Sequence, residues 1–375
     1  MLIIKSIFDC LKYFIYMMMK KLNIGNLSIS VPIVQGGMGV GISLSGLASA
    51  VANEGGVGVI SSAGLGLLYR NLSKDYIQAS IMGLKEELRK AREKTKGVIG
   101  VNVMVAMSNF ADMVKTAIAE KADIIFSGAG LPLNLPSFLQ KDSVTKLVPI
   151  VSSARAARVI TEKWHNLYNY LPDAFVVEGP KAGGHLGFKD EQINDEHFSL
   201  EHILPEVIDE VKDIETHYGK NIPVIVAGGI YTGEDIKRFM DMGAAGVQMG
   251  TRFVTTEECD ASDIFKQTYI EAKQEDIQII QSPVGMPGRA IFSKFIQKVK
   301  EGQKQPKTCM CKCIKTCDIS KSPYCIIAAL YNAFKGNMDN GYAFAGANAF
   351  RATKIVSVKE TFRSLLDEFN RAINK

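Results

Sequence analysis

Short apolar segments alternate with longer amphipathic segments along the chain from about residue 31 onward. Eight of the apolar segments are rich in Val and Ile and have the length of a strand: residues 31–37, 57–62, 98–105, 123–128, 146–153, 173–179, 222–229 and 246–253. They show little polar alternation, which is typical of parallel strands that are covered on both faces. We therefore predict eight strands of a parallel sheet.

The segments between these runs have the periodicity of amphipathic helices. One helical face of residues 109–121 carries Phe110, Met113, Val114, Ala117 and Ile118. Similar patterns occur in residues 43–55, 154–168, 232–243 and 262–273. Strict alternation of strands and helices predicts a parallel sheet, and eight units predict closure into a (β/α)8 barrel. An open doubly wound sheet is the structural alternative.

Local signals mark where two of these helices start. Ser43 is the expected N-cap of the helix in residues 43–55, which ends at a glycine, and Thr232 is the expected N-cap of the helix in residues 232–243. Hydroxyl side chains suit this position because they accept a hydrogen bond from a free N–H of the first helical turn.

Two regions lie outside the repeat. Residues 63–97 form one long amphipathic stretch, predicted to be a helix with a solvated, charged face. Residues 274–350 follow the eighth unit and contain a cysteine cluster and a Gly/Asn-rich string. We expect an α/β TIM barrel over residues 22–273, an appended subdomain or lid over 274–350, and a C-terminal helix within 351–375 that packs on the barrel.

The first 21 residues are apolar, with Lys5, Asp9 and Lys12 among them. These charges leave no uninterrupted apolar span of the roughly 20 residues that a membrane helix needs, and no signal-peptidase site follows. Because Met17–Met19 precede a natural-looking start, we interpret residues 1–21 as a leader that is disordered or arises from an upstream start codon. An interfacial amphipathic helix is the alternative.

Composition narrows the class of protein further. Hydrophobic residues make up 47% and charged residues 22% of the chain, which is typical of a globular enzyme. The net charge of +5 is mild and no Lys/Arg stripe stands out, so no nucleic-acid partner is predicted. The odd, clustered count of seven cysteines argues against a secreted disulfide scaffold and favours the cytoplasm.

Five of the cysteines form a cluster near the C-terminus: Cys309, Cys311, Cys313, Cys317 and Cys325. Their spacing fits neither the CxxC pairs of structural zinc sites nor the CxxCxxC run of ferredoxins. We therefore predict no metal and a lid or dimer-contact loop with reduced thiols, which leaves a homodimer open. A site built from Cys313, Cys317 and Cys325 is the metal alternative.

Glycines gather where the predicted strands end, which is the active face of such barrels. Gly228 and Gly229 follow the seventh strand, and Gly250 and Thr251 follow the eighth. Backbone N–H groups without a Cβ, next to a helix N-terminus, can hold a phosphate. This favours a phosphorylated ligand such as FMN, whereas tight turns without a ligand are the alternative.

One histidine lies among small residues at the end of the sixth strand. His185 occurs in the segment 178–187, EGPKAGGHLG, whereas the other four histidines lie in polar, charge-rich segments. An imidazole can take a proton near neutral pH or donate a hydrogen bond to developing negative charge. His185 is therefore the catalytic candidate.

Six motifs, in order, resemble a known family: VPIVQGGMG, GVNVM, SGAGLPLNLP, EGPKAGGHLG, PVIVAGGI and GVQMGTRF. They are similar to the nitronate monooxygenase family, formerly 2-nitropropane dioxygenase, and equally to the flavin-dependent enoyl-acyl-carrier-protein reductases. The resemblance runs from about residue 22 to 300, with weaker echoes in 341–350 and 356–369. It implies an oxidoreductase with bound FMN.

Carried over by position, the resemblance assigns roles to individual residues. Gly184 and His185 would lie over the flavin ring, and His185 would face the substrate. The cofactor-binding residues it implies are Gln35, Gly36, Gly37, Met38, Asn102, Glu178, Gly184, Ala227, Gly228, Gly229, Gln248, Met249, Gly250 and Thr251. Where these families often carry Glu, this chain has Lys181, which would attract an anionic substrate or point to solvent.

The resemblance implies oxidation of alkyl nitronates, such as propionate 3-nitronate, by O2 to a carbonyl compound and nitrite. The alternative is reduction of an enoyl thioester, with NAD(P)H and acyl carrier protein as partners. A flavin-binding sensor without turnover is the non-enzyme alternative. Barrels of the IMP dehydrogenase type are disfavoured because they need a nucleophilic cysteine where this chain has His185.

Overall fold

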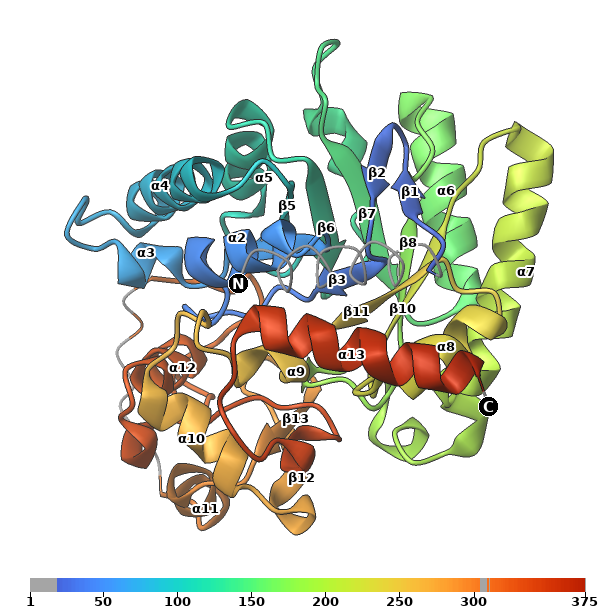
Figure 1. The fold of residues 1–375 in the computed structure, drawn as a ribbon. Helices are drawn as coiled ribbons and strands as arrows, with labels where there is room; N and C mark the ends of the chain where they lie inside the picture. Colours follow the sequence, from blue (N-terminus) through green and yellow to red (C-terminus); the bar gives the residue numbers. More distant parts are fainter. Residues whose placement is uncertain (1–18, 304–308, 310, 375) are drawn as a thin grey trace, which may run out of the picture.

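The computed structural model describes residues 19–303, 309 and 311–374 (Figure 1). The predicted leader therefore lies outside the described residues except for Met19–Lys21. Among the described residues, no helix combines the length and the apolar character needed to cross a membrane.

Eight parallel strands close into a barrel. They are β3 (Ile33–Gln35), β4 (Val57–Ser61), β5 (Val98–Met104), β6 (Ile124–Gly128), β7 (Lys146–Val151), β8 (Phe175–Glu178), β10 (Val224–Ala227) and β11 (Gly246–Met249). Each strand pairs with its neighbours in the order of the sequence, and β11 returns to β3 through the pair Val247 and Ile33. The predicted barrel is confirmed, and the open sheet is excluded.

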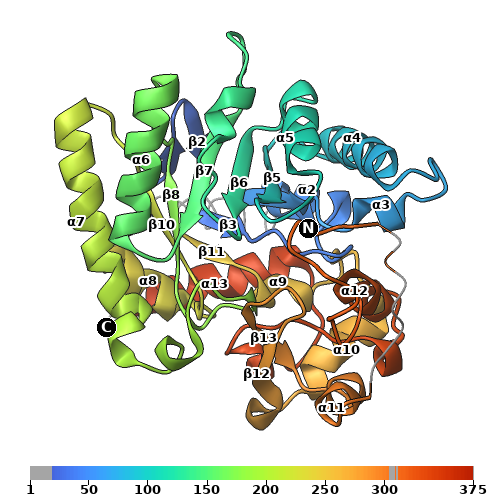
Figure 2. The same ribbon diagram turned by 180° about the vertical axis from the view of Figure 1, so that it is seen from behind.

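Helices follow most of the strands and form the outer layer (Figures 1 and 2). They are α2 (Ser45–Asn53), α3 (Leu65–Leu68), α4 (Tyr76–Lys94), α5 (Phe110–Ala119), α6 (Ala154–Tyr168), α7 (Leu200–Tyr218), α8 (Gly233–Asp241) and α9 (Thr251–Val254). Helix α10 (Asp263–Glu271) lies apart from this layer, with the segment that follows it.

Two details of the predicted alternation are wrong. Between β6 and β7 the chain forms only the 3-10 helix η1 (Leu135–Phe138). Pro132 and Pro136 explain this, because each lacks the N–H that a regular α-helix would use. Residues 63–97 form two helices, α3 and α4, instead of one.

Of the two predicted N-caps, the structure confirms one and not the other. Thr232 is confirmed as the N-cap of α8, since its side chain accepts a hydrogen bond from the N–H of Asp235. Ser43 does not cap α2. Instead, the carboxylate of Asp260 accepts hydrogen bonds from the N–H groups of Leu44 and Leu47, at 2.8 and 3.1 Å.

A hairpin closes the N-terminal end of the barrel. Strands β1 (Leu22–Ile24) and β2 (Leu27–Ile29) pair antiparallel, and their buried side chains join the core inside the barrel. A second apolar layer lies between the strands and the helices. Because the hairpin occupies one end, the carboxyl ends of the strands form the accessible face.

The segment after α10 forms a group of elements beside that face (Figures 1 and 2). It contains β12 (Ile277–Gln281), β13 (Pro287–Ile291), α11 (Lys294–Lys300) and α12 (Ile326–Phe334). Strand β13 pairs antiparallel with β9 (Gly184–His185). The strand that carries His185 is thus part of a three-stranded sheet with the appended segment.

The last helix, α13 (Val358–Ile373), packs against α8 and α2. The rings of Phe362 and Phe253 are 5.8 Å apart, and the N–H of Gly233 donates to the carboxylate of Glu368 at 2.8 Å. A side chain at Gly233 would meet the backbone of α13, since its Cβ would lie 2.1 Å from the carbonyl oxygen of Leu365. The chain end therefore holds the start of α8.

Candidate active site

A cavity of about 310 Å³ opens at the carboxyl ends of the barrel strands. Residues at the end of every barrel strand contribute to its wall. Further parts of the wall come from Tyr76 of α4, from α10 and from the appended segment, including Phe344 and Asn348. The cavity is thus formed between the barrel mouth and a segment that comes much later in the sequence.

Most of the residues singled out from the sequence lie in this wall. They are Gly36, Gly37, Met38, Asn102, Glu178, Gly184, His185, Ala227, Gly228, Gly229, Gln248, Met249, Gly250 and Thr251. Gln35 does not line the cavity. It is fully buried in the barrel, where its amide accepts a hydrogen bond from the N–H of Val59 at 3.0 Å and donates to the carbonyl of Gly36.

His185 is held by residues of the appended segment. Its Nε2 lies 2.8 Å from the hydroxyl oxygen of Ser282, and its ring meets the ring of Phe344 edge-on at 5.0 Å. Burial lowers the pKa of His185 to about 4, because desolvation disfavours the charged imidazole. The side chain is therefore neutral at neutral pH and can both donate and accept a hydrogen bond.

Sequence reasoning missed Ser282 and Phe344. Both lie in the segment 274–350, which has no barrel-like periodicity. The Pro/Gly-rich string SPVGMPG at 282–288 was the available signal, since such strings mark turns. Only pairing of β13 with β9 brings this string to the histidine.

Glu178 is the second titratable group at the end of β8 that faces the cavity. Burial raises its pKa to about 7, because the carboxylate is the form that loses hydration. At neutral pH the imidazole of His185 is therefore uncharged, and the carboxyl of Glu178 is protonated to a larger extent than an exposed carboxyl.

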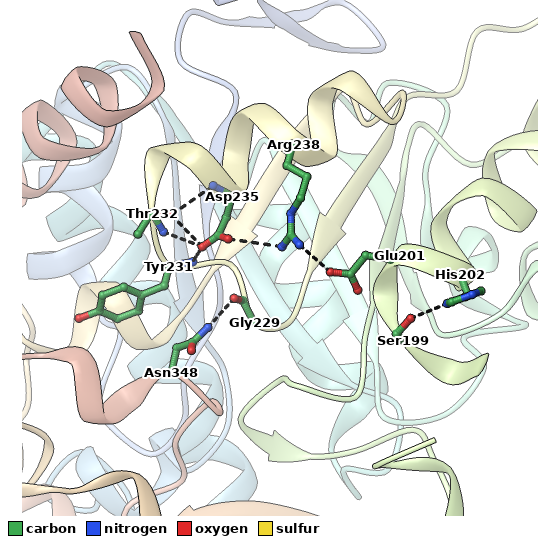
Figure 3. A network of polar contacts seen from close by, with 9 residues as sticks. All are labelled: Ser199, Glu201, His202, Gly229, Tyr231, Thr232, Asp235, Arg238 and Asn348. Atoms are coloured by element: carbon green, nitrogen blue, oxygen red, sulfur yellow. Dashed lines mark hydrogen bonds and ion pairs between the residues drawn. The ribbon is translucent and has the colours of Figure 1, made fainter. Parts of the chain in front are cut away.

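The turn between β10 and α8 presents open backbone to the cavity. Gly228 and Gly229 have φ angles of +95° and +88°, a region that other residues rarely adopt. Asn348 donates to the carbonyl of Gly229 at 2.6 Å (Figure 3). The N–H groups of Tyr231 and Thr232 both donate to Asp235 at 3.0 Å. These contacts fix the turn without covering its glycines.

A positively charged corner adjoins this turn. The guanidinium groups of Arg252 and Arg351 lie 5.0 and 4.8 Å from the centre of the Tyr231 ring. The hydroxyl of Tyr231 and the Nε of Arg252 are buried without a hydrogen-bond partner among the described residues. Since buried polar groups are normally paired, these atoms fit an anionic group placed beside the turn.

The cysteine cluster forms part of the opposite wall. Cys313 is buried and lines the cavity, whereas the other four thiols are partly exposed. The N–H of Ser108 donates to the carbonyl of Cys313 at 3.1 Å, and that of Lys315 donates to Ala106 at 3.0 Å. The cluster is thereby attached to the loop after β5. In the described part of the chain, no group of three His, Cys, Asp or Glu side chains is arranged to hold a metal.

This combination of barrel, cavity and histidine agrees with a comparison to known families. The family model described as nitronate monooxygenase matches residues 20–368. The chain belongs to the nitronate monooxygenase family. It is therefore an oxidoreductase, and this family consists of flavoenzymes.

Proteins that are similar in sequence to this chain carry more than one named activity. The chain is 29% identical over 278 residues to a (3aS,4S,5R,7aS)-5-hydroxy-7a-methyl-1-oxo-octahydro-1H-indene-4-carboxyl-CoA dehydrogenase from Mycobacterium tuberculosis, covering 74% of this chain and 68% of the relative. It is 26% identical over 300 residues to a probable nitronate monooxygenase from Staphylococcus saprophyticus, covering 74% of this chain and 80% of the relative.

Two solved structures resemble the chain over most of its length. FabK from Thermotoga maritima aligns with a TM-score of 0.70 and 26% identity, covering 92% of this chain and 94% of that protein. A nitroalkane oxidase from Streptomyces ansochromogenes aligns with a TM-score of 0.69 and 20% identity, covering 92% of this chain and 97% of that protein. At that identity the second likeness concerns the fold alone.

Proposed function

We propose that this member of the nitronate monooxygenase family binds FMN in the cavity and oxidises alkyl nitronates, such as propionate 3-nitronate, with O2 to a carbonyl compound and nitrite. The observation that carries the proposal is the neutral His185 in the wall of a cavity that also includes the glycine-rich turn after β10, with the guanidinium of Arg252 beside that turn at Tyr231. This arrangement suits a phosphorylated cofactor and a small substrate above it.

The residues present fit FMN. Gly36, Gly37 and Met38 would lie along the flavin. At Gly37 the side chain of Asn102 leaves no room for a larger residue, because a Cβ there would lie 2.3 Å from the Cβ of Asn102. The phosphate would be held by the backbone of Gly228, Gly229, Gly250 and Thr251. The unpaired hydroxyl of Tyr231 would then gain a partner.

Bound FMN would supply the electron acceptance and the reaction with O2, and the chain would supply position and electrostatics. Neutral His185 would donate a hydrogen bond to a nitronate oxygen, or take the proton from a neutral nitroalkane. Its position would be kept by Ser282 and Phe344, which contact the imidazole on the appended side. Small neighbours, Ala182 to Gly184, leave room for the substrate.

Anaerobic mixing tests the function directly. The purified yellow protein is mixed separately with propionate 3-nitronate, NADH and NADPH, and flavin absorbance is followed. We expect rapid bleaching by the nitronate, with nitrite released after O2 is admitted, and no bleaching by either nicotinamide. Bleaching by NADH or NADPH alone would reject nitronate oxidation as the function.

Enoyl-thioester reduction is the second candidate. The likeness to FabK, an enoyl-acyl-carrier-protein reductase, favours it, as does a relative named for a CoA thioester. In that case NAD(P)H would reduce the flavin and acyl carrier protein would bring the substrate. Consumption of NADPH that depends on crotonyl-CoA in the same assay would support this candidate.

A further inference from the structure

Arg289 is a buried cation beside the loop that carries His185. It lies in β13, is 7% exposed, and pairs in register with Gly184 of β9. Its Nη1 donates hydrogen bonds to two carbonyl oxygens of the same loop, those of Pro180 and Ala182, the second at 2.7 Å. One guanidinium nitrogen thus fixes two peptide groups that lie just before His185.

The charge of Arg289 has no counter-ion nearby. Among the described residues, no carboxylate lies within 4 Å of its guanidinium. Burial lowers its pKa to about 10, so the group still carries its charge at neutral pH. A buried cation without a carboxylate is costly, and a hydrophobic side chain of similar size would avoid that cost. The two carbonyl dipoles are the compensation that the fold provides.

The loop is held along its whole length by the same region of the chain. The N–H of Leu186 donates to the carbonyl of Pro287 at 2.9 Å, and that of Ala347 donates to Lys181 at 3.1 Å. The N–H of Ala345 in turn donates to the carbonyl of Arg289 at 3.0 Å. Arg289 therefore stands where the two anchoring segments meet.

We propose that Arg289 is a positioning residue that sets the location of His185 over the cavity. Its side chain fixes the carbonyls of Pro180 and Ala182, and its backbone strand fixes Gly184 and His185. The role of His185 itself rests on the proposed function, but the position of the loop does not. Arg289 is not among the residues that line this cavity, although Ala182, which it contacts, does line it. It lines a second cavity, whose wall also includes Lys181, Gly228 and Gly229. Toward His185, Arg289 acts through the loop.

A double-mutant cycle distinguishes positioning from general stability. In the FMN-loaded enzyme, Arg289→Met should lower kcat with propionate 3-nitronate on the order of 100-fold, because a displacement of about 1 Å has that effect on a catalytic group. The same change in a His185→Asn background should cost less than about threefold, since no positioned imidazole remains. Arg289→Lys should recover part of the rate, because an ammonium can still donate to these carbonyls.

Lys266→Met is the matched control. Lys266 is another buried cation, 4% exposed, that donates to a backbone carbonyl, that of Glu257, at 3.1 Å. It lies in α10 and does not contact the loop. Its loss should affect stability, with equal effects on kcat in both backgrounds. Equal effects of Arg289→Met in both backgrounds would overturn the proposal.

Amide hydrogen exchange gives a readout that is independent of the substrate. In Arg289→Met, the N–H of Leu186 should exchange at least tenfold faster, whereas Lys266→Met should leave it unchanged. If the enzyme does not oxidise nitronates, this measurement still tests the position of the loop, and unchanged exchange rejects the proposal. If Arg289→Met does not fold, Arg289→Gln, which removes the charge and the guanidinium donors, takes its place in both experiments.

Discussion

At the scale of single residues, Glu178 and His185 face the same cavity, and burial moves their pKa values in opposite directions, to about 7 and about 4. Both changes favour the uncharged form. Lys181 adds a positive charge in the cavity wall, and the guanidinium groups of Arg252 and Arg351 lie beside Tyr231, which also lines the cavity. Such a field favours an anionic ligand over a cationic one.

The raised pKa of Glu178 predicts a pH-dependent cost in stability. Between its ordinary value of 4.5 and about 7, the folded state binds more protons at this group than the unfolded state. The contribution of Glu178 to stability is therefore full below pH 4.5 and is lost as the pH rises to 7. Glu178→Gln should match the wild type near pH 4.5 and exceed it at pH 7 by at most about 3 kcal/mol.

Urea unfolding of the flavin-free protein at several pH values measures this difference. Glu191→Gln, an exposed carboxylate outside the cavity, is the control and should show no such trend. A constant difference between Glu178→Gln and the wild type across pH 4.5 to 7.5 would contradict the prediction.

Lys181 predicts a charge effect on substrate binding. Its side chain is exposed at the rim of the cavity. Lys181→Glu should raise KM for propionate 3-nitronate about 3- to 10-fold and leave kcat nearly unchanged, because the charge acts on approach and binding. Lys189→Glu makes the same charge change at an exposed position that does not line the cavity. Steady-state kinetics that are the same for both variants would exclude this role.

Single residues differed in how well the sequence predicted them. Strings of glycine after apolar runs marked strand ends, so His185 and the turn glycines could be located in the cavity wall. Gln35 was misplaced because successive residues of a strand point to opposite sides, and adjacency to Gly36 does not reveal which side. Ser282 lies 97 residues from His185, and no periodicity connects the two.

At the scale of elements, the turn between β10 and α8 gives the sharpest prediction. A Cβ at Gly228 would lie 2.7 Å from the carbonyl oxygen of Gly179, and its φ of +95° strains any other residue. Gly228→Ala should therefore distort the turn and weaken FMN binding by at least about tenfold, on the proposed assignment of this turn to the phosphate. Fluorescence titration of the flavin-free protein measures the change.

Gly219→Ala is the matched control for this substitution. Gly219 also has a positive φ, +68°, but it ends α7, and no atom of the described residues lies within 4 Å of the position that a Cβ would take. Its replacement should cost about 1 kcal/mol of stability and leave FMN affinity unchanged. Equal losses of affinity in both variants would point to stability and not to the turn.

Helix starts show why elements are only partly predictable. The cap of α8 is local, so Thr232 could be read from its neighbours. The start of α2 depends on Asp260, which is 216 residues from Leu44. Ser43 has the right chemistry, but its hydroxyl instead accepts a hydrogen bond from the N–H of Met38 at 2.8 Å. A local pattern cannot reveal a carboxylate that arrives from the other end of the barrel sequence.

At the scale of the whole molecule, the barrel was predictable and the appended segment was not. The eight strands repeat one physical pattern, and each can be recognised by itself. The appended segment contacts the barrel through β9, a strand of two residues. Residues 184 and 185 are a strand because they pair with β13, so their own sequence does not predict it. Its role as a wall of the cavity is a property of the assembled fold.

The position of the cysteine cluster in that wall predicts a pattern of thiol reactivity. Because Cys313 is buried in the cavity wall, N-ethylmaleimide should label it more slowly than Cys311, whose pKa is lowered by the hydrogen bond from the Cys313 thiol. Saturating FMN should slow labelling of Cys313 further, by about tenfold or more. Peptide mass spectrometry over time measures each site.

Cys259 is the control for this experiment. It is 4% exposed and lies outside the cavity wall, so it should also react slowly, but at a rate that FMN does not alter. Labelling of Cys313 that is insensitive to FMN would show that the ligand does not reach this wall.

The seam of the barrel has a consequence for biosynthesis. The barrel closes when β11 pairs with β3, which lies near the start of the chain. The wall of the cavity also includes Asn348, which is translated later still. Because the N-terminal part leaves the ribosome first, a nascent chain carries an open sheet with an exposed apolar interior for most of its synthesis. On the proposed binding of FMN in this cavity, the complete cofactor site exists only after translation has passed Asn348.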